Sequence, residues 1–274
     1  MNLIRQTMVA AVLGVFTAGC GQAPEPGSLK VSNGQETADH EHQSVVMLYY
    51  SSGANQGSVC TGTFIDHDTL ITAAHCTMGG DADRNGRVDL TVNVIKLEKN
   101  ASGENQARII AESTEIHRHP QWDAEFRRVQ VNAYDLAVIR FPAGTAPETS
   151  AIRSRQARTG ERFTIVGFGL NHVPRNPARA DSSSVGTKRH GRNTIDSVSS
   201  GFINFSGVGD FTNGDGDNVN SAPGDSGGPM FIGGELVGVT SGGGRTLFGG
   251  GRSAYIDLHS SVSRSFLRSR GIDY

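Results

Sequence analysis

Long hydrophobic runs are scarce in this 274-residue chain, and the scarcity excludes a helical membrane protein. The longest apolar run, Met8 to Ala18, has 11 residues. A membrane-spanning helix needs about 20. Arg5 supplies a positive charge ahead of the run, and this order is typical of a signal peptide. We therefore expect residues 1–19 to be a targeting segment that directs export.

Long basic stretches are also absent, and the formal net charge is only −2 with a pI near 6.5. This excludes a protein built to bind nucleic acid or an anionic membrane surface. About 244 of the 274 residues are expected to belong to the folded body. That length suffices for one large all-β domain or a tight pair of smaller ones, each with its own core.

Cysteine is rare, and its three positions are informative because an exported chain with an odd number leaves one unpaired. Cys60 and Cys76 lie 16 positions apart, close enough to pair. A disulfide closing such a loop contributes roughly 3 kcal/mol and needs an oxidising compartment. Cys20 is then left over. One alternative is that Cys20 is a free thiol and is lost with the signal peptide.

A lipid attachment would explain Cys20. Thr17-Ala18-Gly19-Cys20 resembles the bacterial lipobox, although Thr17 stands where that motif usually has a large aliphatic residue. We expect lipidation at Cys20 and a location in the bacterial cell envelope, as a lipid-anchored precursor, or outside the cell. An ordinary secretory signal cut near the same place is the alternative.

Glycine is abundant and dispersed, with 36 residues spread along the chain, as in proteins of many short strands joined by tight turns. Near the C-terminus, Leu258, Val262 and Phe266 recur every four residues and predict an amphipathic helix over about 259–270. Together these features favour an all-β sandwich or barrel. The polar segments 171–193 and 207–220 are expected to be exposed loops. The expected strands are 45–50, 63–65, 69–72, 90–97, 136–141, 162–168, 200–205, 229–232, 235–240 and 253–257.

Three short motifs supply the residues needed for attack on a carbonyl group. They are Thr72-Ala73-Ala74-His75-Cys76, Asp135-Leu136-Ala137-Val138-Ile139 and Gly224-Asp225-Ser226-Gly227-Gly228-Pro229. A serine hydroxyl needs a base to take its proton, and histidine has a suitable pKa. The histidine needs a carboxylate to fix its tautomer. Backbone N–H groups beside glycines can stabilise the oxyanion that forms. Each motif alone is compatible with a structural role, but the three together favour catalysis.

In order and spacing, these motifs resemble those of the trypsin and chymotrypsin family of serine peptidases (the S1 family), from Val31 to the C-terminus. The resemblance implies that Ser226 is the nucleophile, His75 the general acid and base, and Asp135 the orienting carboxylate. The amides of Gly224 and Ser226 would form the oxyanion hole. Cys60 and Cys76 match the family's disulfide beside the histidine.

The implied fold is all-β, with two packed six-stranded antiparallel β-barrels at about 31–148 and 149–258, followed by the C-terminal helix. The implied function is a serine endopeptidase that acts on protein or peptide substrates and is a monomer. The alternatives are a catalytically silent binding or adhesion protein with the same fold, and an esterase using the same three residues.

An activation site also resembles that of the family. In Lys30-Val31-Ser32-Asn33-Gly34, cleavage after Lys30 would free the amino group of Val31 to pair with Asp225. Residues 20–30 would then be a propeptide, and another protease would be the activator. Val31 and Ser32-Asn33 depart mildly from the family's usual residues. The alternative is a plain linker.

The resemblance places Asn220 at the base of the primary specificity pocket, with Ser221 beside it. Ser241 would line the substrate cleft and hold Asp135, and Gly243 would leave one wall of the pocket open. Because Asn220 offers a neutral amide in place of a carboxylate, we expect a preference for uncharged residues before the cut.

No cofactor is expected to be required. Asp81, Asp83, Asn85 and Asp89 place oxygen atoms in a pattern that resembles the start of a calcium loop. The closing glutamate of such a loop is missing, because Val92 stands in its place. A solvated turn is therefore the favoured interpretation, and no metal site is predicted.

Overall fold

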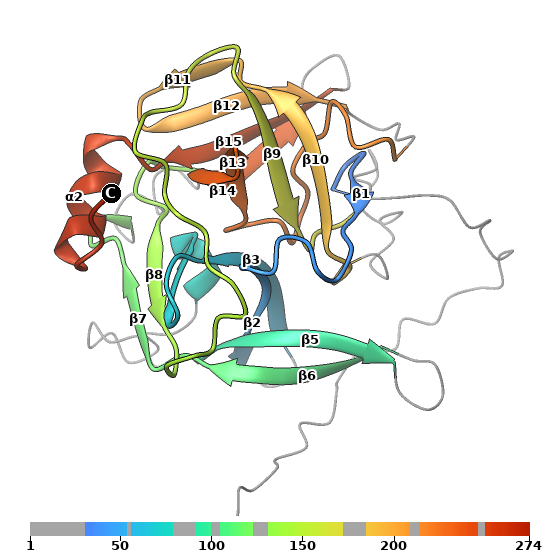
Figure 1. The fold of residues 1–274 in the computed structure, drawn as a ribbon, viewed down its shortest axis with the longest axis vertical. Coiled ribbons are helices and arrows are strands. Elements are labelled where there is room, and N and C mark those ends of the chain that lie inside the picture. The colour runs from blue at the N-terminus through green and yellow to red at the C-terminus, as the bar shows by residue number, and fades with distance from the viewer. Residues whose placement is uncertain are drawn as a thin grey trace, which may run out of the picture.

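The computed structural model describes residues 31–53, 56–78, 91–99, 105–122, 131–171, 185–208, 214–245 and 250–274. These residues form two curled antiparallel sheets stacked one above the other, with a helix at one side (Figure 1). Within the described residues, one sheet has seven strands and the other has eight.

The seven-stranded sheet comes from the first half of the chain and has the strand order β6-β5-β2-β3-β4-β8-β7. Most apolar residues of its central strands are buried. The strands are β2 (Val45–Gly53), β3 (Gln56–Phe64), β4 (Thr69–Thr72), β5 (Val92–Lys99), β6 (Asn105–Glu112), β7 (Glu115–Arg118) and β8 (Ala137–Arg140).

The eight-stranded sheet has the order β1-β10-β9-β13-β14-β15-β12-β11. Most of it comes from the second half of the chain. Its strands are β1 (Gln35–Glu36), β9 (Arg162–Gly167), β10 (Arg189–Thr194), β11 (Ser197–Ser199), β12 (Phe202–Gly207), β13 (Pro229–Ile232), β14 (Glu235–Arg245) and β15 (Gly251–Asp257).

The expected fold class is confirmed: the chain is mostly β, its two sheets curl into half-barrels, and a helix lies near the C-terminus. The sheets differ from the expected six strands each. In addition, β1 lies in the range expected for the first barrel but pairs with β10 of the second sheet. The N-terminal segment of the folded body therefore crosses over to the other half.

Helix α2 (Ser261–Ser269) lies within the range predicted for it. Ser260 caps its first turn by accepting a hydrogen bond from the amide of Ser263. Phe266 and Leu267 are buried and anchor the helix on the body. Among the helices of the described residues, none has the length and apolar character to cross a bilayer.

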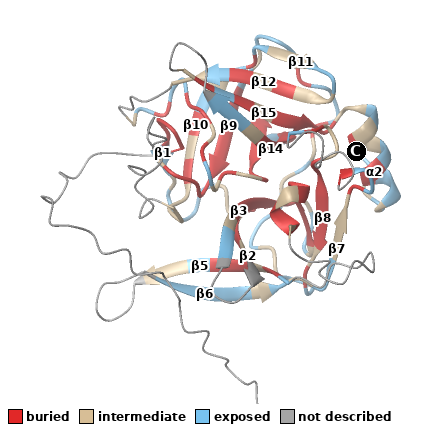
Figure 2. Ribbon diagram, turned by 180° about the vertical axis from the view of Figure 1, so that it is seen from behind, coloured by how far each residue is buried: buried red, intermediate tan, exposed pale blue. Residues whose placement is uncertain are grey.

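Figure 2 shows that buried residues lie on strands of both sheets. The larger apolar cluster runs from the first sheet, where it includes Leu48 and Ile139, across to Phe231 and Val239 of the second. A second apolar cluster is formed mainly by residues of the eight-stranded sheet, and it includes Phe205. Because the larger cluster spans both sheets, the halves are packed as one body.

The prediction of an exposed loop over 171–193 was wrong at its C-terminal end. Arg189 begins β10, and it is 3% exposed in the sheet. The strand was missed because its inward-facing positions hold Arg189 and Gly191, not the apolar residues that usually mark a buried strand.

Candidate active site

The pairing of β4 with β8 brings His75 and Asp135 together. Thr72 at the end of β4 lies opposite Ala137 at the start of β8. His75 follows β4 in the short 3₁₀ helix η1 (Ala74–Thr77), and Asp135 comes just before β8. Two residues 60 positions apart in the chain are thus placed at the same end of one strand pair, within hydrogen-bonding distance.

The carboxylate of Asp135 is fully buried and accepts three hydrogen bonds. Its Oδ1 accepts from the backbone amide of His75 at 2.9 Å, and its Oδ2 accepts from His75 Nδ1 at 2.8 Å. The hydroxyl of Ser241 donates to the same Oδ2 at 2.6 Å. Because an ionised carboxylate only accepts, the proton of a neutral His75 lies on Nδ1 and the lone pair on Nε2.

The loop of Ser226 lies against the segment that precedes His75. The carbonyl oxygen of Ser226 accepts from the amide of Thr61 at 2.8 Å and lies 3.5 Å from Cys76 Sγ. A Cβ on Gly227 would lie 2.0 Å from Thr72 Oγ1, so only glycine permits this approach. Among the described contacts, the Ser226 hydroxyl forms no hydrogen bond with His75. Such bonds often tighten only when substrate binds.

Two backbone amides in this loop have no acceptor within the described part of the chain: those of Gly224 and Ser226. The amides that surround them are all used. Asp225 donates to Ala222 at 3.0 Å, and Gly227 and Gly228 donate to Thr240 and Asp225, both at 2.8 Å. Unused donors flanking a serine are what an oxyanion needs.

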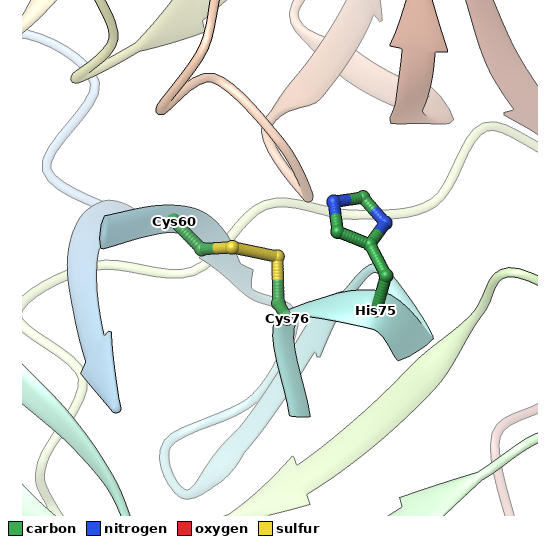
Figure 3. A group of neighbouring side chains, drawn as sticks. All are labelled: Cys60, His75 and Cys76. Carbon is green, nitrogen blue, oxygen red and sulfur yellow. A yellow bond between two sulfur atoms is a disulfide. The ribbon is translucent and has the colours of Figure 1, made fainter. Parts of the chain in front are cut away.

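The predicted disulfide between Cys60 and Cys76 is confirmed, with an S–S distance of 2.05 Å. It ties β3 to η1, from which both Cys76 and His75 project (Figure 3). The potential ligand atoms of these three residues lie within 4.8 Å of one another, but the S–S bond removes both thiolates. The described residues contain no other group of three metal-ligating side chains.

Asp225, which precedes the serine, is 2% exposed. Its carboxylate accepts from the amides of Gly169 and Ala222, both at 2.8 Å. Burial raises the pKa of Asp225 to about 6, and the two hydrogen bonds and the charge of Arg189 oppose that rise. Val31 is itself buried, in the apolar cluster of the second sheet.

The residues predicted to form the specificity pocket also lie together. Asn220 is buried and its Oδ1 accepts from the hydroxyl of Ser253. Ser253 in turn accepts from the amide of Ser221 at 3.0 Å. Gly243 lies opposite Ser253 in the β14–β15 pair. The contacts described among Asn220, Ser221 and Ser253 therefore involve neutral groups only.

Several predicted residues lie outside the described part of the chain. These are Cys20 of the lipobox, Lys30 of the activation site, and the candidate calcium ligands Asp81, Asp83, Asn85 and Asp89.

A model of the trypsin family, described as "Trypsin", matches residues 31–264. The chain belongs to the trypsin family. This family consists of serine peptidases, and the assignment confirms the resemblance on which the sequence prediction rested.

The chain is also similar to individual proteins that are named as trypsins or as a chymotrypsin-like elastase. The chain is 25% identical over 225 residues to "Trypsin" of Saccharopolyspora erythraea, which covers 77% of this chain and 86% of that one. It is 26% identical over 272 residues to "Trypsin epsilon" of Drosophila erecta, covering 93% and 94%. "Chymotrypsin-like elastase family member 1" of Canis lupus familiaris is 28% identical over 152 residues, covering 52% of each chain.

Sequence reasoning missed three residues that support the site: Thr61, Gly169 and Arg189. Gly169 had a signal, because Gly167-Phe168-Gly169 places two glycines at the end of a strand, where close backbone contact is common. A Cβ on Gly167 would lie 2.1 Å from Asp225 Oδ1. Thr61 and Arg189 carried no local signal.

Proposed function

We propose that this protein is a serine endopeptidase that cleaves peptide bonds with Ser226, His75 and Asp135. One observation carries the proposal. The hydrogen-bonded chain from Ser241 through Asp135 to His75 ends beside a serine loop whose Gly224 and Ser226 amides are unused within the described residues. Membership of the trypsin family supports the same assignment.

The proposed reaction follows the properties of these groups. Nε2 of His75 takes the hydroxyl proton as Ser226 Oγ attacks the substrate carbonyl carbon. Asp135 stabilises the imidazolium that forms, and the amides of Gly224 and Ser226 donate to the oxyanion. His75 then gives its proton to the leaving amine. Water attacks the acyl-enzyme with His75 again as base, and this step releases the acid and restores Ser226.

We infer that the substrates are proteins or peptides with an uncharged residue before the cut. Asn220, Ser221 and Ser253 satisfy one another with neutral hydrogen bonds, so the floor lacks the carboxylate that would attract Lys or Arg. Kinetics with matched tetrapeptide substrates would test this. A steep preference for arginine over alanine, leucine and tyrosine would overturn it.

We further propose that the chain is exported, that Cys20 carries a lipid, and that cleavage after Lys30 activates the enzyme and separates it from the anchor. The burial of Val31 close to the second core supports a role for its amino group. Intact mass and N-terminal sequencing of the mature protein would test these steps. A mature protein starting elsewhere than Cys20 or Val31 would contradict them.

The decisive experiment is labelling by a fluorophosphonate probe, which reacts with an activated serine. We expect labelling at Ser226, loss of labelling in Ser226→Ala, and unchanged labelling in Ser206→Ala, a surface serine of β12. Absence of labelling in the chain after cleavage at Lys30 would favour a silent binding protein. Labelling with hydrolysis of esters but of no peptide would favour an esterase.

A further inference from the structure

Asp225 is a buried carboxylate held by neutral donors. No Lys, Arg or His of the described residues forms an ion pair with it. Its oxygens accept from the amides of Gly169 and Ala222. In the 274-residue chain Val31 follows Lys30 through a peptide bond, so Val31 carries no ammonium group. A buried charge in this position is costly unless some positive charge compensates it.

Arg189 is the cation that faces this carboxylate from the neighbouring strand. It is 3% exposed at the start of β10, opposite Gly167 of β9. Its Nη1 donates to the carbonyl of Gly169 at 3.2 Å and to that of Thr187 at 3.3 Å. Gly169 thus accepts from Arg189 through its carbonyl and donates to Asp225 through its amide.

Gly167, the last residue of β9, and Gly169, two residues beyond it, allow this arrangement. A Cβ on Gly167 would lie 2.1 Å from Asp225 Oδ1, and one on Gly169 would lie 2.7 Å from it. The carboxylate therefore lies directly on the backbone that Arg189 borders. The positive charge of Arg189 lowers the pKa of Asp225 against the effect of burial. Among the described residues, Tyr255 also interacts with Asp225, but burial raises the pKa of its hydroxyl, which therefore remains neutral.

The position of Asp225 determines the shape of the serine loop. Its backbone amide donates to Ala222 at 3.0 Å and its carbonyl accepts from Gly228 at 2.8 Å. Its side chain closes the same turn through the amide of Ala222. Whatever keeps Asp225 ionised and in place therefore also holds the loop that carries the amides of Gly224 and Ser226.

We propose that Arg189 is a positioning residue that supports Asp225 before cleavage, so that the uncleaved chain already reacts at Ser226. The inference rests on the proposed peptidase function. It goes beyond it because it assigns a role to a buried arginine outside the triad and makes the precursor active, although less so than the cleaved enzyme. Cleavage after Lys30 would then replace a distant charge with an ammonium in direct contact.

The test uses the full chain with Lys30→Gln, which removes the proposed cleavage site. Three variants are added in that background: Arg189→Met, which keeps most of the side-chain volume without the charge, Arg189→Lys, which keeps a charge, and Arg192→Met. Arg192 is a matched control because it lies on the same strand and its side chain is 55% exposed. The readout is the rate of fluorophosphonate labelling at Ser226.

We expect the uncleaved chain to label, Arg189→Met to slow labelling about tenfold or more, and Arg189→Lys to restore part of the rate. Arg192→Met should leave the rate unchanged. In a chain with Lys30 intact that has been cleaved to start at Val31, Arg189→Met should have a much smaller effect, because the new ammonium supports Asp225. If Arg189 only stabilised the fold, Arg189→Met would slow labelling of the uncleaved and cleaved chains equally. Equal slowing would therefore overturn the proposal.

Two further outcomes separate this inference from the proposed function. If the uncleaved chain does not label but the cleaved chain does, the peptidase function stands and the role of Arg189 is wrong. If neither form labels, the proposed function itself fails. Circular dichroism and the unfolding midpoint of each variant identify any that do not fold. Should Arg189→Met not fold, Arg189→Gln would provide the same comparison.

Discussion

The hydroxyl of Ser241 and Nδ1 of His75 donate to the same oxygen of Asp135, at 2.6 Å and 2.8 Å. Ser241 therefore helps to orient the imidazole indirectly, because its hydroxyl holds the carboxylate of Asp135 and that carboxylate holds the ring of His75. Ser241 comes from β14 of the second sheet, whereas His75 and Asp135 lie next to β4 and β8 of the first. The site therefore depends on correct packing of the two sheets.

Replacing Asp135 with asparagine should reduce kcat by roughly 10⁴-fold. The amide would favour the wrong tautomer of His75, while binding of substrate would change little. Steady-state kinetics on a peptide substrate would measure this, with KM as the internal control. A loss confined to KM would contradict the proposed role of Asp135.

Ser241→Ala should weaken the folded state as well as catalysis. The variant removes one donor from a fully buried carboxylate, and a hydrogen bond to a charged group contributes about 1.5–3 kcal/mol. Urea unfolding would report the change. Ser206→Ala, at an exposed position of β12, is the control, for which we expect less than about 0.5 kcal/mol. Equal effects of the two substitutions would contradict the importance of the Ser241 contact.

Removing the disulfide through Cys60→Ala with Cys76→Ala should lower the free energy of unfolding by roughly 3 kcal/mol. Activity should fall as well, because the bond tethers the residue next to His75 to β3. Denaturant titration of the double variant, followed by a labelling assay, would check both. Unchanged labelling kinetics in the folded double variant would show that the tether does not position His75.

Two glycines with positive φ give a matched pair. Gly227 has φ +78° and a Cβ there would lie 2.0 Å from Thr72 Oγ1, whereas Gly233 has φ +63° and open space around it. Gly233→Ala should cost about 1 kcal/mol from backbone strain alone. Gly227→Ala should cost more and abolish labelling at Ser226. Similar losses of labelling at both positions would contradict a specific contact at Gly227.

The effect of cleavage on stability should depend on pH. The pKa of Asp225 is raised in the folded chain from 3.8 to about 6, so protonation favours the folded state. This contribution is fully present below pH 3.8 and is lost as the pH rises through 6. Cleavage after Lys30 would supply an ammonium that stabilises the ionised form.

The unfolding temperatures of cleaved and uncleaved chains should therefore be close at pH 4 and diverge by pH 7, with the cleaved chain higher. Differential scanning calorimetry would measure this. The same comparison in Asp225→Asn is the control, because that variant has no carboxylate to ionise and should show no pH-dependent divergence. A constant gap in the wild-type protein would contradict the coupling between Val31 and Asp225.

The three motifs of the candidate site could be recognised from the sequence because the pattern of each is local. His75 and Ser226 each lie within a run of small residues that few other functions require. The sequence predicted the apolar strands such as β4 and β9 for the same reason. β10 was missed because a buried arginine looks like a surface residue, and β6 because it is an edge strand with exposed Ile109 and Ile110. The contact of Arg189 with Gly169 depends on strand pairing, which no local pattern reports.

The crossing of β1 into the second sheet affects how the protein is made. Thr37, just after β1, and His190 of β10 are in contact although 153 residues separate them in the chain. At a synthesis rate of 5–20 residues per second, β1 waits roughly 8–30 s for its partner to appear. The first half therefore cannot complete its N-terminal connection while it is being synthesised. The strand β1 therefore stays unpaired until synthesis has passed β10, which is compatible with the export proposed above.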